Sequence, residues 1–159
     1  MTDIQFGSVL PSPSHELLEH TQAYYKITFP KTYVDFISEN NGGVPDHNEF
    51  LFEGNYYLVE RFTSLLNNDL RDTLADDNWC EMRSIITQLD ERLVDDEDLI
   101  GMNIIPIAIL FAGDYVCLDY RKDANNPSVC LWFHEKSREF APGTEKIANN
   151  FEEFIHMLE

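Results

Sequence analysis

The chain has 159 residues, of which 43% are hydrophobic, and this is enough for one domain with a buried core. It contains 11 lysines and arginines against 29 aspartates and glutamates, which gives a formal net charge of -18. Such a negative surface repels phosphate backbones and anionic lipids, so we expect no direct binding to nucleic acid or to a membrane. The charge suits a basic protein partner, and it equally suits a role in solubility alone.

The cysteines and the N-terminus indicate the compartment. Cys80, Cys117 and Cys130 form an odd set without paired spacing, which is typical of a reducing cytosol rather than of a disulfide framework. The chain begins without the basic start and apolar core of a signal peptide. Its most apolar run, residues 104–112, is shorter than the ~20 residues that span a bilayer. We expect a soluble, cytoplasmic protein.

The first part of the chain predicts an arm and a helix. Residues 1–11 are expected to form a loosely attached arm. Ser12 and Pro13 then favour a helix start, with Ser12 as the cap and Pro13 at the first helical position. This helix is predicted to extend to about Tyr25. Its buried stripe is expected to comprise Leu17, Leu18, Ala23 and Tyr24.

An aromatic helix follows over residues 29–41. Pro30 suits its first turn because the missing N–H breaks no helical hydrogen bond. Gly42 and Gly43 are expected to supply positive φ angles at its end, and Pro45 prevents continuation. The residues predicted to share its buried face are Phe29, Tyr33, Phe36 and Ile37.

The middle of the chain predicts a hairpin and then two helices. Residues 46–49 should form a loop, and aromatic strands at 50–53 and 56–62 should be joined by a Gly54-Asn55 turn. From residue 63 to about 93 the apolar spacing is helical, with a break near residues 76–78. Asp95-Asp96-Glu97-Asp98 forms an acidic turn that Gly101 closes.

The last third predicts strands at 104–112, 115–120, 129–134 and 145–148, with a turn at Gly113-Asp114. Pro106 suggests an edge strand or a bulge. Asn149 is expected to cap a final helix, with Glu152 completing a capping box. The segregation of helices and hairpins predicts one α+β domain over residues 1–159, with an antiparallel sheet and helices packed mainly on one face.

The candidate catalytic and metal-binding patterns are incomplete. His15 and Glu16 begin an HExxH-like helix, but the position four residues after His15 is Glu19 and not His. A calcium loop starting at Asp96 would place Ile100 where an oxygen ligand belongs and Ile107 where a bidentate Glu belongs. A metal-dependent hydrolase that uses His47 or His134 is a weaker alternative, because no ligand set has the required spacing. We therefore predict no catalytic residue, no metal and no cofactor.

Charge is concentrated between residues 69 and 98, which contain eleven acids and three bases. This segment either steers a basic partner or simply provides solvated helix faces that cover the sheet. As candidate partner-contact residues we select Asp76, Asp77, Asp95, Asp96, Glu97 and Asp98.

Several motifs occur in the order known from one family. Phe29-Pro30 with Tyr33, Phe36 and Asn41-Gly42-Gly43 resembles the opening of the SUKH superfamily (Smi/Knr-like) of bacterial immunity proteins. The likeness extends over about residues 27–158, with residues 1–26 outside it. The later motifs are Ile105-Pro106-Ile107-Ala108, Gly113-Asp114 with Leu118-Asp119, Val129 with Trp132, and Ile147-Ala148 with Asn150 to Phe154. The usual Leu before Pro30 is Phe29 here, and residues 63–101 carry no motif of the family.

This resemblance implies an α+β fold and a non-catalytic function. Such a protein would be an antitoxin that binds a cognate toxin, expected to be basic and of the nuclease type, and neutralises it by occlusion in the cytoplasm. The alternative is a non-catalytic regulatory or scaffold module that binds another protein. The sequence leaves self-association open.

Overall fold

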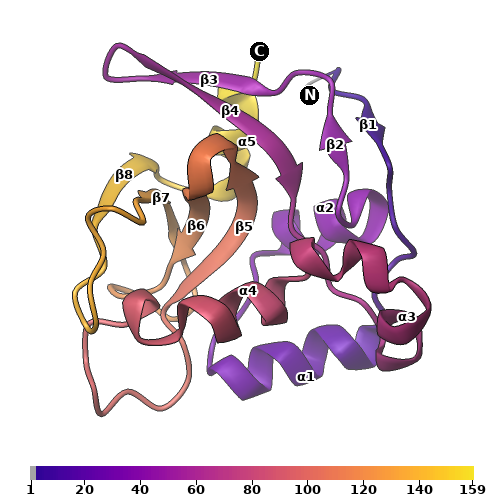
Figure 1. The fold of residues 1–159 in the computed structure, drawn as a ribbon, viewed down its shortest axis with the longest axis horizontal. Coiled ribbons are helices and arrows are strands. Elements are labelled where there is room, and N and C mark those ends of the chain that lie inside the picture. Colours follow the sequence, from indigo (N-terminus) through magenta and orange to yellow (C-terminus); the bar gives the residue numbers. More distant parts are fainter. Residues whose placement is uncertain (1–2) are drawn as a thin grey trace.

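The computed structural model describes residues 3–159, and its centre is a six-stranded antiparallel sheet. The strands follow one another in chain order, β3-β4-β5-β6-β7-β8 (Figure 1). This confirms the predicted α+β class with an antiparallel sheet. Their bounds are β3 Glu49–Phe52, β4 Asn55–Phe62, β5 Ile104–Leu110, β6 Tyr115–Asp119, β7 Ser128–Trp132 and β8 Thr144–Ala148.

Five α-helices and a small second sheet complete the described part of the chain. The helices are α1 His15–Tyr25, α2 Lys31–Asn40, α3 Asn68–Thr73, α4 Met82–Leu89 and α5 Phe151–Met157. Short 3-10 helices occupy Ala75–Cys80, Asp90–Leu93 and Phe111–Gly113. The second sheet pairs β1 Phe6–Gly7 with β2 Val44–Pro45. Among residues 3–159, every helix is too short or too polar to pass through a lipid bilayer.

Helices pack on both faces of the large sheet, whereas the sequence predicted helices mainly on one face. On one face, Phe50 and Phe62 pack edge-on against Phe154 of α5, with ring centroids 5.4 and 6.4 Å apart. On the other face, Ile85 of α4 packs with Ile109 of β5. In Figure 1, α5 lies behind the sheet and α4 crosses in front of its lower end. The centre of the sheet is therefore covered on both sides, which explains why every residue of β5 is buried, whereas the outer strands β3 and β8 keep exposed residues.

The first helix begins two residues later than the sequence suggested. Ser14, not Ser12, is its cap, and its Oγ accepts a hydrogen bond from the Leu17 N–H at 3.1 Å. The buried stripe continues from Leu18 through Thr21 to Tyr25, so the assignment of Ala23 and Tyr24 to it was wrong. Spacings of three and four residues place Thr21 and Tyr25 on the face of Leu18, whereas Tyr24 points outward.

The predicted hairpin turn and the predicted cap of the last helix are each displaced by one residue. Phe52 pairs with Asn55, so the turn residues are Glu53 and Gly54, both with positive φ as a type I′ turn requires. The cap of α5 is Asn150, whose Oδ1 accepts from the Glu153 N–H at 2.9 Å. The two consecutive positive φ angles fix the turn at Glu53 and Gly54. The hydrogen bond to the Glu153 N–H fixes Asn150 as the cap.

Two further differences arise from long-range hydrogen bonds. Residues 63–67 are not helical, because their N–H groups bond elsewhere: Ser64 donates to the Cys80 carbonyl at 2.9 Å. Pro106 lies in β5, which has a neighbouring strand on each side, so the edge alternative was wrong. The predicted bulge is present, since the β5–β6 register shifts between Pro106 and Ala108.

The exit from α2 organises the surrounding segments. Asn41 is fully buried, and its Nδ2 donates to the carbonyls of Pro11 at 2.7 Å and Leu65 at 2.9 Å. Its Oδ1 accepts from the Leu65 N–H at 2.9 Å. Gly42 has the expected positive φ, but Gly43 does not. Gly43 instead provides space, because a Cβ there would lie 3.1 Å from Phe6.

The N-terminal arm is held firmly, contrary to the expectation of loose attachment. Phe6 and Gly7 pair with β2, and the Leu10 N–H donates to the Asn41 carbonyl at 2.8 Å. The first two residues of the predicted arm lie outside the described residues. Pairing with β2 and anchoring at Asn41 together explain why residues 6–10 follow a defined path across the domain.

Asn41→Ala is expected to destabilise the protein by about 2–4 kcal/mol, because it leaves buried backbone groups of Pro11 and Leu65 without partners. Urea unfolding followed by circular dichroism measures the change. The control is Asn68→Ala, which removes an exposed side chain and should change the free energy of unfolding by less than about 0.5 kcal/mol. Equal effects of the two substitutions would contradict the role given to Asn41.

Candidate protein-binding surface

The acidic segment presents mainly negative charge to solvent, because its three arginines are half-buried and directed to partners within the protein. Arg83 bonds Glu81, Arg92 lies over the Trp132 ring at 5.5 Å, and Arg71 donates to the Ser84 Oγ at 3.2 Å. A hydrogen bond and repulsion from Glu139 raise the pKa of Glu91, a sign of crowded acids. The exposed acids of the segment are Asp69, Asp72, Asp76, Asp90, Glu91, Asp95, Asp96, Glu97 and Asp98.

Glu81 is the exception, since its carboxylate is fully buried at the start of α4. It accepts from the Arg83 Nε at 2.9 Å and N–H at 2.6 Å, and from the Leu66 N–H at 3.3 Å. These bonds cap the helix and satisfy the buried charge. Glu81 therefore positions α4 and is not available to a partner.

The candidate contact residues lie in two groups. Asp76 and Asp77 precede α4, whereas Asp95 to Asp98 follow it after the 3-10 helix, so the groups flank α4 at opposite ends (Figure 1). Asp77 is half-buried, and its Oδ1 accepts from Arg61 Nη1 at 3.3 Å. Arg61 also donates to the carbonyls of Gly42 and Ser8. Asp77 thus has an internal partner, while Asp76 is exposed.

The acidic turn is held against the end of α1. The Asp96 Oδ1 accepts from the Asp98 N–H at 2.9 Å, and the Met102 N–H donates to the Tyr25 carbonyl at 2.9 Å. Gly101 has a φ of 105°, and a Cβ there would lie 2.5 Å from the Tyr25 carbonyl oxygen. This close approach leaves the neighbouring Ile100 79% exposed.

A groove lies between α1 and α4, and we call it the α1–α4 groove. It consists of clefts of about 650, 220 and 450 Å³ that share lining residues. The first two share His20 and Arg83, and the last two share Tyr24, Tyr25 and Thr87. The groove therefore follows α1 from Ser14 to the acidic turn.

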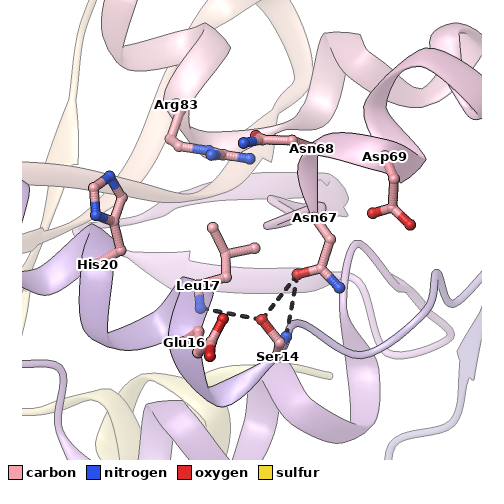
Figure 2. Close-up of a pocket in the computed structure, with 8 residues that line it drawn as sticks. All are labelled: Ser14, Glu16, Leu17, His20, Asn67, Asn68, Asp69 and Arg83. Carbon is pink, nitrogen blue, oxygen red and sulfur yellow. Dashed lines mark hydrogen bonds between the residues drawn. The ribbon is translucent and has the colours of Figure 1, made fainter.

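Figure 2 shows the end of the groove near the start of α1. Leu17 points into the cleft, and the Arg83 side chain extends across it towards Asn68. The Asn67 Oδ1 accepts from Ser14 Oγ at 3.1 Å, which joins the start of α1 to the segment before α3. The cleft is polar at its rim and apolar at Leu17.

The other end of the groove is more aromatic. Tyr24 is 69% exposed; its ring stacks on His20 with centroids 6.4 Å apart and meets Tyr25 edge-on at 5.2 Å. Burial, together with the Glu81 carboxylate, raises the pKa of Tyr25 to about 12. Tyr25 therefore keeps its proton at neutral pH. It is buried, so the exposed contact surface at this end of the groove comes from Tyr24 and Ile100.

The histidines and cysteines considered for chemistry outside the groove are paired or deeply buried. His47 lies 2.8 Å from the Asp46 Oδ1, and His134 lies 3.2 Å from the Asp114 Oδ1. Burial raises the pKa of the Cys117 and Cys130 thiols, which keeps them protonated and weakly nucleophilic. Among residues 3–159, no three His, Cys, Asp or Glu side chains gather closely enough to hold a metal ion.

Sequence reasoning did not identify Tyr24 and Ile100 as surface residues. Tyr24 had been assigned to the buried stripe of the first helix, and Ile100 had been considered only as a misfit in a calcium loop. The sequence does contain one indication that Ile100 is exposed. It lies between an acidic run and Gly101, where few apolar neighbours along the chain could cover it. For Tyr24, only the observed start of α1 at His15 and its buried face identify the exposed side.

Comparison with known proteins places the chain in a family. The model of SUKH_6, described as SMI1-KNR4 cell-wall, matches residues 15–155. The chain belongs to this SUKH family. The suspected superfamily is thereby confirmed, and members of the SUKH family are often immunity proteins. The matched range contains α1, α4 and every residue that lines the α1–α4 groove except Ser14. No curated protein and no solved structure matches the chain.

Gly101→Ala is expected to destabilise the domain by about 1–3 kcal/mol, because the new Cβ meets the Tyr25 carbonyl in an unfavourable φ region. The acidic turn should shift away from α1, which amide chemical shifts of residues 99–102 would report. Gly54→Ala is the matched control, since Gly54 has a positive φ but an open surrounding. A Gly101→Ala variant no less stable than Gly54→Ala would contradict the close packing described here.

Proposed function

We propose that this SUKH protein is an immunity protein that binds a cognate toxin and neutralises it by occlusion in the cytoplasm of the producing cell. The protein acts by binding and performs no reaction of its own. The toxin is basic and of the nuclease type, because a nuclease must attract nucleic acid phosphates. The acids of this chain compete with those phosphates for the toxin's lysines and arginines.

The observation that carries the proposal is the one-sided charge of residues 69–98. With Arg71, Arg83 and Arg92 directed inward, nine exposed acids are left with little internal compensation. Such a surface accelerates encounter with a basic protein and disfavours acidic ones. Membership of a family that often contains immunity proteins supports the same interpretation.

A second candidate is a non-catalytic regulatory or scaffold module that binds another protein. The words "cell-wall" in the description of the matched family favour it. Both candidates require a protein-binding surface on the same fold, so the identity of the bound protein separates them. A cell-wall regulator would bind a partner that is not toxic when expressed alone.

Co-expression with the toxin domain encoded beside its gene tests the main proposal. We expect the chain to restore growth and to co-purify with the toxin as a stoichiometric complex, because occlusion requires a stable contact. Growth assays and size-exclusion chromatography provide the readouts. Continued cell death without co-purification would reject the immunity function for that toxin.

The association rate with the toxin is expected to fall about tenfold or more when ionic strength rises from about 0.05 M to about 0.5 M, because exposed charges are screened. The variant Glu97→Lys with Asp98→Lys should associate several-fold more slowly at low salt and retain its stability, as exposed charges contribute little to folding. Stopped-flow fluorescence measures the rates.

The matched control reverses Glu39 and Glu152, two exposed acids on α2 and α5, to lysine. This variant has the same net charge as the first, so it isolates the position of the charge from its amount. We expect its association rate to stay closer to that of the unaltered protein. Identical association rates for the two variants would show that residues 95–98 are not the part of the surface that steers the toxin.

A further inference from the structure

We infer that the α1–α4 groove is the docking surface for the toxin, and that a basic segment of the toxin occupies it and covers Tyr24 and Ile100. This inference rests on the proposed function and adds the place of contact and the chemistry of the contacting segment. The groove is made of residues from α1 on one side and, on the other, from the start of α3, from α4 and from the segment up to Met102, which are all distant from α1 in the sequence.

The apolar anchors of the groove lie together at one end. Tyr24 and Ile100 both line the cleft of about 450 Å³, and they are 69% and 79% exposed. Large side chains that remain this exposed beside a cleft gain contact area when a partner fills it. Ile86 and Met102 line the same cleft, so a partner's apolar side chain would meet an apolar lining.

The charges around the groove select a basic occupant. Glu16 and Asp69 line the cleft near the start of α1, and Asp90 lines the cleft at its end. The acidic turn that contains Ile100 adds residues 95–98 beside that end. Arg83 is directed to Glu81 and to the Leu66 carbonyl, which reduces its repulsion of a cation. Lysine and arginine side chains of a partner would therefore find carboxylates at both ends of the groove.

The length of the groove limits what can lie in it. α1 has 11 residues and is therefore about 16 Å long, so a helical segment of about three turns would match it. An amphipathic segment could direct one apolar side chain to Tyr24 and Ile100 and its basic side chains to the acidic rim. The occupant is thus a short segment with lysine or arginine around an apolar centre.

The β3–β4 hairpin provides the comparison surface. It exposes Tyr56 (63%) and Leu51 (48%), which pair with each other across the strands on a sheet face. These residues match Tyr24 and Ile100 in size, and Tyr56 also matches Tyr24 in exposure, while Leu51 is less exposed than Ile100. They lie outside the α1–α4 groove and its acidic turn. Substitutions there measure the effect of removing exposed apolar area alone.

The decisive experiment measures the dissociation constant of the neighbouring gene's toxin domain for two double variants. Tyr24→Ala with Ile100→Ala should weaken binding about tenfold or more, whereas Tyr56→Ala with Leu51→Ala should change it less than about threefold. Urea unfolding checks that both variants remain folded. If the hairpin variant loses more affinity than the groove variant, or the groove variant still binds tightly, the groove is not the docking surface. The immunity function would stand in either case.

A second measurement tests the groove without the toxin. A synthetic peptide of about eleven residues, with leucines at spacings of three and four and lysines at most other positions so that it forms an amphipathic helix, is titrated into the labelled protein. We expect amide shifts to concentrate at Tyr24, Thr87 and Ile100 and to disappear at high salt. Shifts concentrated on the β3–β4 hairpin, or spread evenly over all acids, would overturn the inference. If the toxin fails to bind the unaltered protein, the proposed function fails, and the peptide result still decides for or against a basic-segment groove.

Discussion

The buried amide of Asn41 is the interaction on which the arrangement of this domain depends. One side chain bonds the Pro11 carbonyl, and both the N–H and the carbonyl of Leu65. It thereby joins the end of α2, the N-terminal arm and the segment that leads into the acidic region. Because the amide is fully buried, water cannot reach it, and these bonds satisfy the polar groups on both sides. Gly42 and Gly43 then let the chain leave α2 in the space between Leu10, Ser64 and Phe6.

The basic side chains around α4 pair with acids or carbonyls inside the protein, and the acids that are left lie on the surface. Glu81 and Arg83 form a buried pair that anchors α4, and Arg61 joins Asp77 to the Gly42 and Ser8 carbonyls. Each internal pair uses a base, and the chain has only 11 of them against 29 acids. The surface around α4 is consequently negative. A high net charge opposes compaction, so such a surface is a cost unless it serves solubility or a basic partner.

The α1–α4 groove exists because a glycine permits two backbones to approach. Gly101 lies directly against the Tyr25 carbonyl, and the Met102 N–H donates to the same oxygen. This contact holds the acidic turn beside α1 and leaves Ile100 and Tyr24 exposed near one cleft. The proposed contact surface thus depends on backbone packing, while the exposed side chains of Tyr24 and Ile100 make few contacts inside the protein. Such side chains can change between family members without loss of the fold.

The sequence by itself determined the class of fold, the position of most strands and the exit of α2, because period-two and period-3.6 patterns, glycines and prolines act locally. It also located the acidic segment. Only the tertiary structure decided that Tyr24 points outward, that Asn150 and Ser14 are the caps, and that residues 63–67 are not helical. These features depend on hydrogen-bond partners far along the chain, such as Asn41 for Leu65 and Asn67 for Ser14. The groove could not be predicted from the sequence for the same reason, because only folding brings its two walls and its acidic end together.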